Sequence, residues 1–146
     1  MHTASPGSPF SIIVAPIQII TTKDKEECAI FTASFSKAWK TGKKEEVVHI
    51  FTLSQLGKRL SMDTGTWGIS GPVEKITVPL RLALTHQKKV LRAVPIISVK
   101  KKDILAILSP GKEDKLSLIP KINKLAPDST PNEILAALPA GGISLK

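Results

Sequence analysis

Hydrophobic and polar positions alternate along several stretches of this chain, and alternation of this kind predicts strands. The clearest stretch runs from Lys75 to Leu84, where every second residue is aliphatic: Ile76, Val78, Leu80, Leu82 and Leu84. Thr85–Lys88 has the composition of a tight turn, and Lys89–Val99 predicts the returning strand of a hairpin. We therefore expect one face of this hairpin to lie against the core.

Two further strands are predicted nearer the N-terminus. Phe10–Ile20 is an apolar run rich in β-branched residues, and Pro16 in its middle favours a sheet edge because proline cannot donate to a ladder. After a charged turn, apolar residues alternate again, with Thr32, Ser34 and Ser36 on the opposite face: Ala29, Phe31, Ala33, Phe35 and Trp39.

Helical spacing appears in two places. From Lys43 to Leu60 apolar residues recur every three or four positions, with Glu45 and Glu46 in the first turn, where the helix dipole favours acids. Lys58 and Arg59 are basic residues in its last turn. The second helix is marked by a capping box made by Thr130 and Glu133, with Pro131 at the first helical position.

These patterns predict an α+β fold with a single domain. An antiparallel sheet of four to five strands is expected to pack on one long amphipathic helix, with short C-terminal helices in addition. Residues 1–9 are small, polar and rich in proline, which predicts a disordered N-terminal arm. Residues 10–108 form the α+β core domain of this interpretation, and residues 109–146 form a proline-rich tail with a short helix at 131–138.

Composition narrows the class of protein. A chain of 146 residues buries about 70% of its unfolded surface on folding, so it needs no metal or disulfide for stability. Cys28 is the single cysteine, which is typical of a reducing compartment. We see neither a signal peptide nor an apolar run of the roughly 18 residues that a membrane span needs. The expected location is intracellular, in the cytoplasm or nucleus, or in the virion if the source is viral.

Charge is the most informative part of the composition. The formal net charge is +9, and residues 37–102 hold fourteen Lys or Arg residues against four acids. A surface that collects such an excess attracts phosphate-bearing partners in a salt-dependent way. The predicted anion-binding residues are Lys37, Lys40, Lys43, Lys44, Arg81, Lys88, Lys89, Arg92, Lys100, Lys101 and Lys102.

Signals for enzymatic chemistry are weak. Asp63-Thr64-Gly65 shares three residues with the catalytic loop of aspartic proteases, but Ser61 stands where an aliphatic strand residue is expected, and a turn is favoured. The glycines of GTWGISG run into a strand, whereas phosphate-binding loops end at a helix N-terminus. The three histidines lie on separate segments without ligand spacing. We predict no enzymatic activity, no catalytic residue, no metal and no cofactor.

The order of several segments resembles that of rhabdovirus matrix proteins. The segments are a predicted strand IIVAPIQII, a predicted helix ending in FTLSQLGKRL, a glycine loop, and WGISGPVEKITVPLRLAL, and together they span about residues 10–100. The resemblance implies a twisted antiparallel sheet packed on helices, and a protein that condenses the nucleocapsid, lines the envelope and self-associates. The chain departs from the family in its short length and in lacking PPxY and P-T/S-A-P budding motifs.

Two hypotheses for function follow. The first is a non-enzymatic, basic, matrix-type virion protein that bridges nucleocapsid and membrane and self-associates. The second is a small RNA-binding protein without sequence specificity, such as a nucleoprotein accessory or a silencing suppressor. The expected partners are nucleic acid or nucleoprotein, an anionic membrane surface, and further copies of the chain docked through the apolar C-terminal segment LAALPAGGISL, with no small-molecule substrate.

Overall fold

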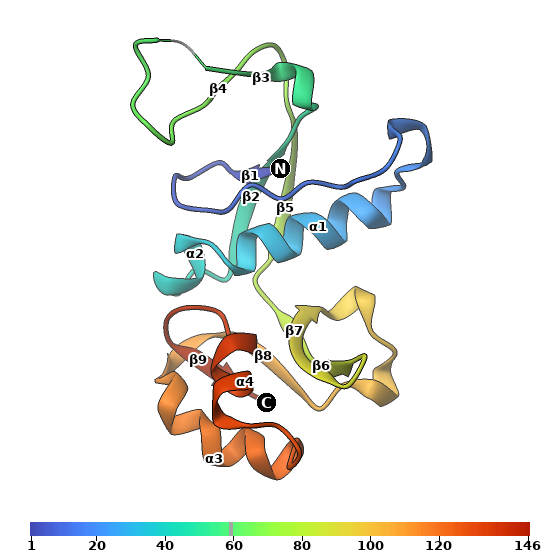
Figure 1. The fold of residues 1–146 in the computed structure, drawn as a ribbon, viewed down its shortest axis with the longest axis vertical. Helices are drawn as coiled ribbons and strands as arrows, with labels where there is room; N and C mark the ends of the chain where they lie inside the picture. The colour runs from blue at the N-terminus through green and yellow to red at the C-terminus, as the bar shows by residue number, and fades with distance from the viewer. Residues whose placement is uncertain (59) are drawn as a thin grey trace.

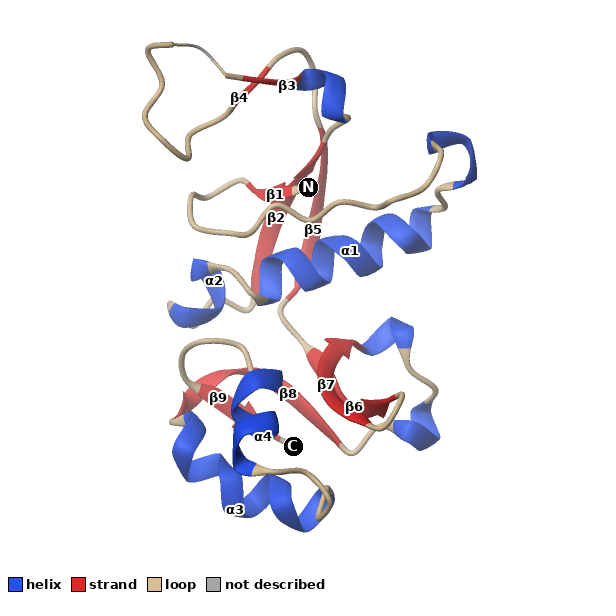
Figure 2. Ribbon diagram, in the orientation of Figure 1, coloured by secondary structure: helices blue, strands red, loops and turns tan. Residues whose placement is uncertain are grey.

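The computed structural model describes residues 1–58 and 60–146, and its strands form two main sheets and a small ribbon (Figures 1 and 2). The first sheet has the order β1-β2-β5, with β1 (His2–Thr3), β2 (Glu45–Ile50) and β5 (Glu74–Pro79). The second has the order β7-β6-β8-β9, with β6 (Leu82–Gln87), β7 (Val90–Pro95), β8 (Ala106–Glu113) and β9 (Ile143–Leu145). β3 (Leu56–Gly57) pairs with β4 (Gly68–Ile69), and all of these pairs are antiparallel.

Two helices lie beside each main sheet (Figure 2). α1 (Thr22–Ser34) crosses β2 and β5 and is followed by α2 (Lys37–Lys40), whereas α3 (Lys115–Leu125) and α4 (Pro131–Ala137) pack on the second sheet. The predicted α+β class, with antiparallel sheets in a single domain, is confirmed. The prediction of one sheet of four to five strands on one long helix is wrong, because the strands divide between sheets and the helices are short.

The strand predicted over Ala29–Trp39 is wrong, because this segment is helical. Thr21 and Asp24 form a capping box, in which the Thr21 N–H donates to Asp24 Oδ2 at 2.8 Å and the Asp24 N–H donates to Thr21 Oγ1 at 3.2 Å. The charged residues read as a turn are thus the first turns of α1. Its buried positions Ala29, Ile30 and Ala33 follow helical spacing. The alternation was misleading, because Phe31 of the predicted apolar face is 42% exposed and Thr32 and Ser34 of the predicted polar face are buried.

The helix predicted over Lys43–Leu60 is also wrong. Residues 45–50 form β2, Leu53–Gln55 forms a short 3₁₀ helix, and β3 follows. Val47, Val48 and Ile50 are β-branched, and their stiff side chains suit a pleated strand better than a helix. Arg59, which belonged to the last turn of the predicted helix, lies outside the described residues.

The alternating segment Lys75–Leu84 contains two strands. Its predicted core face is confirmed at Val78, Leu80, Leu82 and Leu84, which are at most 1% exposed. The chain leaves the first sheet at Leu80, whose N–H donates to the Lys44 carbonyl at 2.9 Å, and enters the second sheet two residues later. One run of alternating residues therefore supplies both sheets and joins their cores.

A hairpin is confirmed in this region, with β6 paired to β7, but its turn is Lys88-Lys89. Residues 85–87, which were predicted to be part of the turn, belong to β6. The rest of the C-terminal region is more regular than predicted, because β8 extends to Glu113, α3 follows and β9 pairs with β8. The capping box at Thr130 and Glu133 is confirmed at the start of α4. Leu118, Ile122 and Ile134 are fully buried, so residues 109–146 contribute to the core.

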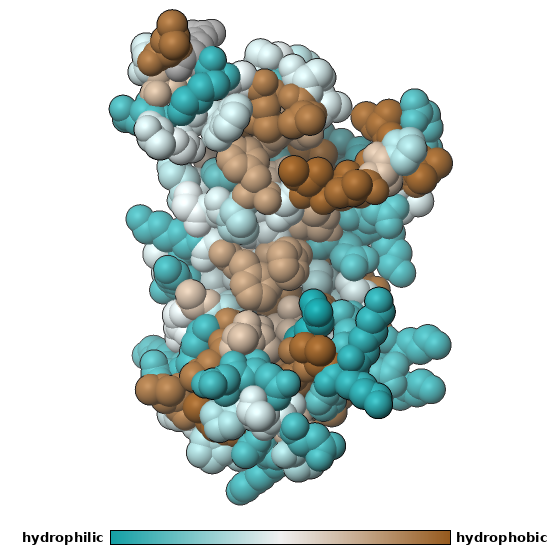
Figure 3. Space-filling view, in the orientation of Figure 1, coloured by the Kyte–Doolittle hydropathy of each residue, from teal (hydrophilic) through white to brown (hydrophobic). Residues whose placement is uncertain are grey.

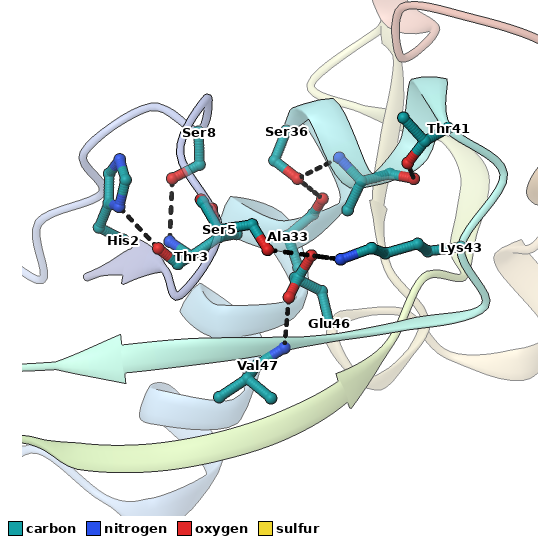
Figure 4. Close-up of polar contacts among 11 residues, drawn as sticks. His2, Thr3, Ser5, Ser8, Ala33, Ser36, Thr41, Lys43, Glu46 and Val47 are labelled. Carbon is teal, nitrogen blue, oxygen red and sulfur yellow. Dashed lines mark hydrogen bonds and ion pairs between the residues drawn. The ribbon is translucent and has the colours of Figure 1, made fainter.

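The N-terminal residues also differ from their prediction. Residues 1–9 were expected to form a disordered arm, yet β1 pairs with β2 and Met1 is only 8% exposed. The Thr3 N–H donates to Ser8 Oγ at 2.9 Å, which closes the turn that follows β1 (Figure 4). The strand predicted over Phe10–Ile20 is wrong, because this segment runs as a loop into a 3₁₀ turn at Ile17–Ile19 and makes no ladder.

Candidate anion-binding surface

All eleven predicted anion-binding side chains are exposed, and the structure places them in two groups. The α2 group consists of Lys37, Lys40, Lys43, Lys44 and Arg81. The basic ridge consists of Lys88, Lys89, Arg92, Lys100, Lys101 and Lys102. Figure 1 shows α2 and the β6–β7 hairpin on opposite sides of the molecule, so the expected single surface is divided.

The α2 group is built on a helix that the fold holds tightly. Ser36 caps α2 by accepting the Ala38 N–H at 3.1 Å, and Trp39 is 1% exposed. The Trp39 indole N–H donates to the Gly142 carbonyl across 103 positions of sequence, at 3.2 Å. Gly141 has a φ of +112°, and a Cβ there would lie 2.9 Å from Lys40 Cα, so this approach requires glycine.

Two members of the α2 group take part in internal contacts. Lys43 Nζ lies 2.7 Å from Glu46 Oε2, and Glu46 Oε1 accepts the Val47 N–H at 3.0 Å (Figure 4). The Glu46 side chain is 5% exposed, so Lys43 neutralises a buried carboxylate. The Lys44 carbonyl receives the Leu80 N–H, which brings the exposed Arg81 to the same edge as Lys44.

The basic ridge begins at the tip of the β6–β7 hairpin. Gln87 pairs with Val90, so Lys88 and Lys89 are the two residues of the turn. Both adopt positive φ, at 50° and 66°, which is the left-handed conformation that the commonest two-residue hairpin turn requires. Lysine is an unusual residue there, and the conformation directs two ammonium groups into solvent.

The rest of the basic ridge lies beside the same hairpin. Arg92 is on the outward face of β7, opposite Thr85 of β6. The Thr85 hydroxyl donates to the Asp103 carbonyl at 2.7 Å, and this bond fastens the 3₁₀ turn Lys101–Asp103 to the other edge of β6. β7, which carries Arg92, and the turn Lys101–Asp103 therefore lie along opposite edges of β6.

Few acids lie close to the basic ridge in the sequence, although Asp24 and Glu27 of α1 line the same hollow as Arg92. Asp103 is the only acid from residue 81 to residue 103, a stretch with seven Lys or Arg residues. Among the described residues, the salt bridges are Lys25–Glu74, Lys43–Glu46 and Lys121–Glu113, and none includes a ridge cation. Figure 3 shows hydrophilic side chains projecting from the side of the molecule where β6 and β7 lie. Unpaired cations at this density concentrate anions.

The structure also exposes a feature that the sequence prediction missed. The sequence predicted a strand over Phe10–Ile20, but the structure has a loop there, and five of its apolar side chains are at least 42% exposed: Phe10, Ile12, Val14, Ile17 and Ile19. The signal that argued against that strand was Pro16, together with the lack of a clear polar alternation. These side chains form an apolar surface next to the basic ridge.

Other chemistry finds little support in the described part of the chain. Asp63-Thr64-Gly65 forms an exposed turn, in which Lys58 Nζ donates to the Asp63 carbonyl at 2.6 Å. No group of three or more His, Cys, Asp or Glu residues that could hold a metal ion is found among residues 1–58 and 60–146. Burial raises the pKa of the Cys28 thiol, which keeps it in the unreactive protonated form.

Comparisons with protein-family models, with curated proteins and with solved structures each gave no match. Within the described residues, no helix combines the length and the apolar character needed to cross a bilayer.

Proposed function

We propose that this protein is a non-enzymatic, basic structural protein that binds anionic surfaces through the basic ridge, in the manner of a matrix-type virion protein that bridges nucleocapsid and membrane. The observation that carries the proposal is the set of six exposed ridge cations that make no salt bridge with any described residue. The matrix-type assignment draws on the sequence resemblance and on the antiparallel sheets flanked by helices. Two elements of the resembling order differ in the structure, because IIVAPIQII is a loop and Leu53–Gln55 is only a short 3₁₀ helix.

The energetics of such a surface are additive and salt-dependent. Each Lys or Arg near an anionic membrane contributes about 1 kcal/mol, and the attraction falls off within the Debye length of about 8 Å at physiological salt. The six cations of the basic ridge are therefore enough for firm but reversible binding to an anionic surface, without a specific pocket.

The test uses two variants that remove the same charge. Lys100→Ala/Lys101→Ala/Lys102→Ala alters the basic ridge, and Lys37→Ala/Lys40→Ala/Lys44→Ala alters the α2 group. We expect the wild-type protein to float with vesicles of phosphatidylcholine and phosphatidylserine at low salt and to dissociate as salt rises. The ridge variant should bind about 100-fold more weakly, and the α2-group variant less than about tenfold, because three cations at the contact contribute roughly 3 kcal/mol. Equal losses in the two variants would remove the basic ridge from the site.

The same titration with single-stranded RNA tests the second hypothesis. The chain has four Phe, two Trp and no Tyr, so few aromatic platforms are available for stacking bases. Binding to RNA without any affinity for the vesicles would favour a small RNA-binding protein over the matrix-type function.

Self-association belongs to the matrix-type proposal, but the C-terminal segment is not a free surface for it. Leu138 is 3% exposed and Ile143 is fully buried, so LAALPAGGISL packs on its own core. Self-association would therefore use another surface. Light scattering at micromolar protein concentrations measures the oligomeric state directly.

A further inference from the structure

Residues 10–20 form the most exposed aliphatic segment of the described chain. Val14 is 94% exposed, Ile12 75%, Ile19 66% and Ile17 62%. The segment contains no Asp, Glu, Lys or Arg. Figure 3 shows hydrophobic side chains gathered in the upper right of the molecule, where Figure 1 places this part of the chain. Contiguous apolar surface of this kind is uncommon on a monomer and marks a contact site.

The segment is held out from the body in a defined way. The Met1 ammonium group donates to the Ser11 carbonyl at 2.7 Å, and the Ser11 N–H donates to the Met1 carbonyl at 3.1 Å. Ile13 then packs against the core, so its neighbours Ile12 and Val14 point away from it. The outward side chains are therefore presented by an anchored loop.

The apolar segment adjoins the basic ridge. A hollow of about 780 Å³ is lined by Phe10, Ile12 and Ile19 together with one ridge cation, Arg92, and with two acids of α1, Asp24 and Glu27. Figure 1 shows the segment and the β6–β7 hairpin on the same side of the molecule, away from α2. Aliphatic side chains beside cations match the two layers of an anionic bilayer, which are acyl chains and charged headgroups.

We propose that Phe10–Ile20 inserts into the interfacial layer of an anionic lipid bilayer while the basic ridge contacts the headgroups. This inference rests on the proposed function. It names a lipid bilayer as the partner of the surface formed by Phe10–Ile20 and the basic ridge. The aliphatic composition favours lipid over nucleic acid, because Ile and Val offer neither stacking surfaces nor base-reading hydrogen bonds.

The backbone sets the depth of insertion. Within the described residues, the backbone groups of residues 12–15 make no hydrogen bond to other backbone groups. Bare backbone is excluded from the hydrocarbon core, where water cannot satisfy it. The loop therefore stays within about 5–10 Å of the headgroup boundary, as interfacial elements do.

The first test compares two pairs of exposed aliphatic residues. Ile12→Ser/Val14→Ser alters the segment, and Leu116→Ser/Leu125→Ser alters exposed positions on α3 as the matched control. On vesicles with 30% phosphatidylserine, we expect the segment variant to bind at least about tenfold more weakly and the control to bind like wild type. The Ile12→Ser/Val14→Ser variant should keep the wild-type urea midpoint, since both side chains lie largely in solvent.

The second test measures depth. Val14→Trp adds a reporter at the most exposed position, and its fluorescence is compared with wild type, which retains Trp39 and Trp67. We expect the added emission to shift to the blue on vesicles and to be quenched by lipids brominated near the headgroup more than by lipids brominated at the chain end. No shift on vesicles that bind the protein would overturn the inference.

The outcomes separate the two proposals. If the ridge variant loses vesicle binding and Ile12→Ser/Val14→Ser does not, the basic ridge binds anions and the insertion is overturned. If the Ile12→Ser/Val14→Ser variant keeps vesicle binding but loses dimers seen by light scattering, the occupant of this surface is a second copy of the chain. If neither variant changes binding, both proposals fail.

Discussion

The two groups of cations in this protein have similar sequence composition and different structural roles. The α2 group lies on a helix fixed by the Trp39–Gly142 hydrogen bond, and Lys43 neutralises a buried carboxylate. The basic ridge lies on a hairpin turn and a short 3₁₀ turn, and none of its cations is in a salt bridge with a described residue. The number of charges along the sequence does not distinguish the α2 group from the basic ridge.

The difference shows why charge density alone does not define a binding site. A cation that already compensates an internal acid offers little further attraction, because binding an external anion competes with the existing pair. A cation on a turn with no acid nearby keeps its full field. We therefore expect substitutions of Trp39 and of the Lys43–Glu46 pair to act on stability and substitutions in the basic ridge to act on binding.

The largest expected effect is that of Trp39→Ala. The indole is 1% exposed and joins α2 to the loop between α4 and β9, so its removal should lower the free energy of unfolding by about 3–5 kcal/mol. Urea denaturation followed by circular dichroism measures this change. Trp67→Ala is the control, because Trp67 is 50% exposed and its loss should cost less than about 1 kcal/mol. Equal costs would mean that α2 is not a structural anchor.

An intermediate effect is expected at the ion pair of the α2 group. Glu46→Ala removes a carboxylate that accepts the Val47 N–H and pairs with Lys43, and it should lower stability by about 1–3 kcal/mol. Lys43 is 47% exposed, so Lys43→Ala should cost about 1 kcal/mol or less. Urea denaturation of both variants measures these changes. If Lys43→Ala is less stable than Glu46→Ala, Glu46 is not the more important partner of the ion pair.

The sequence predicted the second sheet better than the first. The alternation of Lys75–Leu84 identified the buried side chains of β5 and β6, and a hairpin was predicted close to where β6 and β7 form one. The pattern did not show that the run divides between two sheets or that the turn is Lys88-Lys89. α1 was missed because its charged first turns resembled a loop, and because the helix buries Thr32 and Ser34 and exposes Phe31, against the usual hydrophobicity rule. β2 was missed because tertiary pairing with β5 overrode a helical spacing of apolar residues.

The sequence predicted which cations are exposed, but it did not predict which of them lie together in the structure. Exposure of all eleven cations follows from the high cost of burying a charge without a partner. The separation of Lys37–Lys44 from the hairpin depends on the packing of Trp39 against Gly142, which are far apart in the sequence. The exposed segment Phe10–Ile20 was not predictable from hydrophobicity, because an apolar run usually indicates burial.

The smallest expected effect concerns the turn of the basic ridge. Lys88→Asn/Lys89→Gly replaces two lysines at positive φ with residues that prefer the left-handed conformation. The free energy of unfolding should rise by about 1 kcal/mol, because the strain of a side chain at these angles is relieved. Vesicle binding should weaken about 30-fold, since the variant loses two cations that each contribute roughly 1 kcal/mol.

A protein that became more stable while binding more weakly would show that these lysines are placed for binding at the expense of stability. Unchanged binding would exclude the hairpin tip from the contact, and unchanged stability would mean that the turn tolerates lysine without strain.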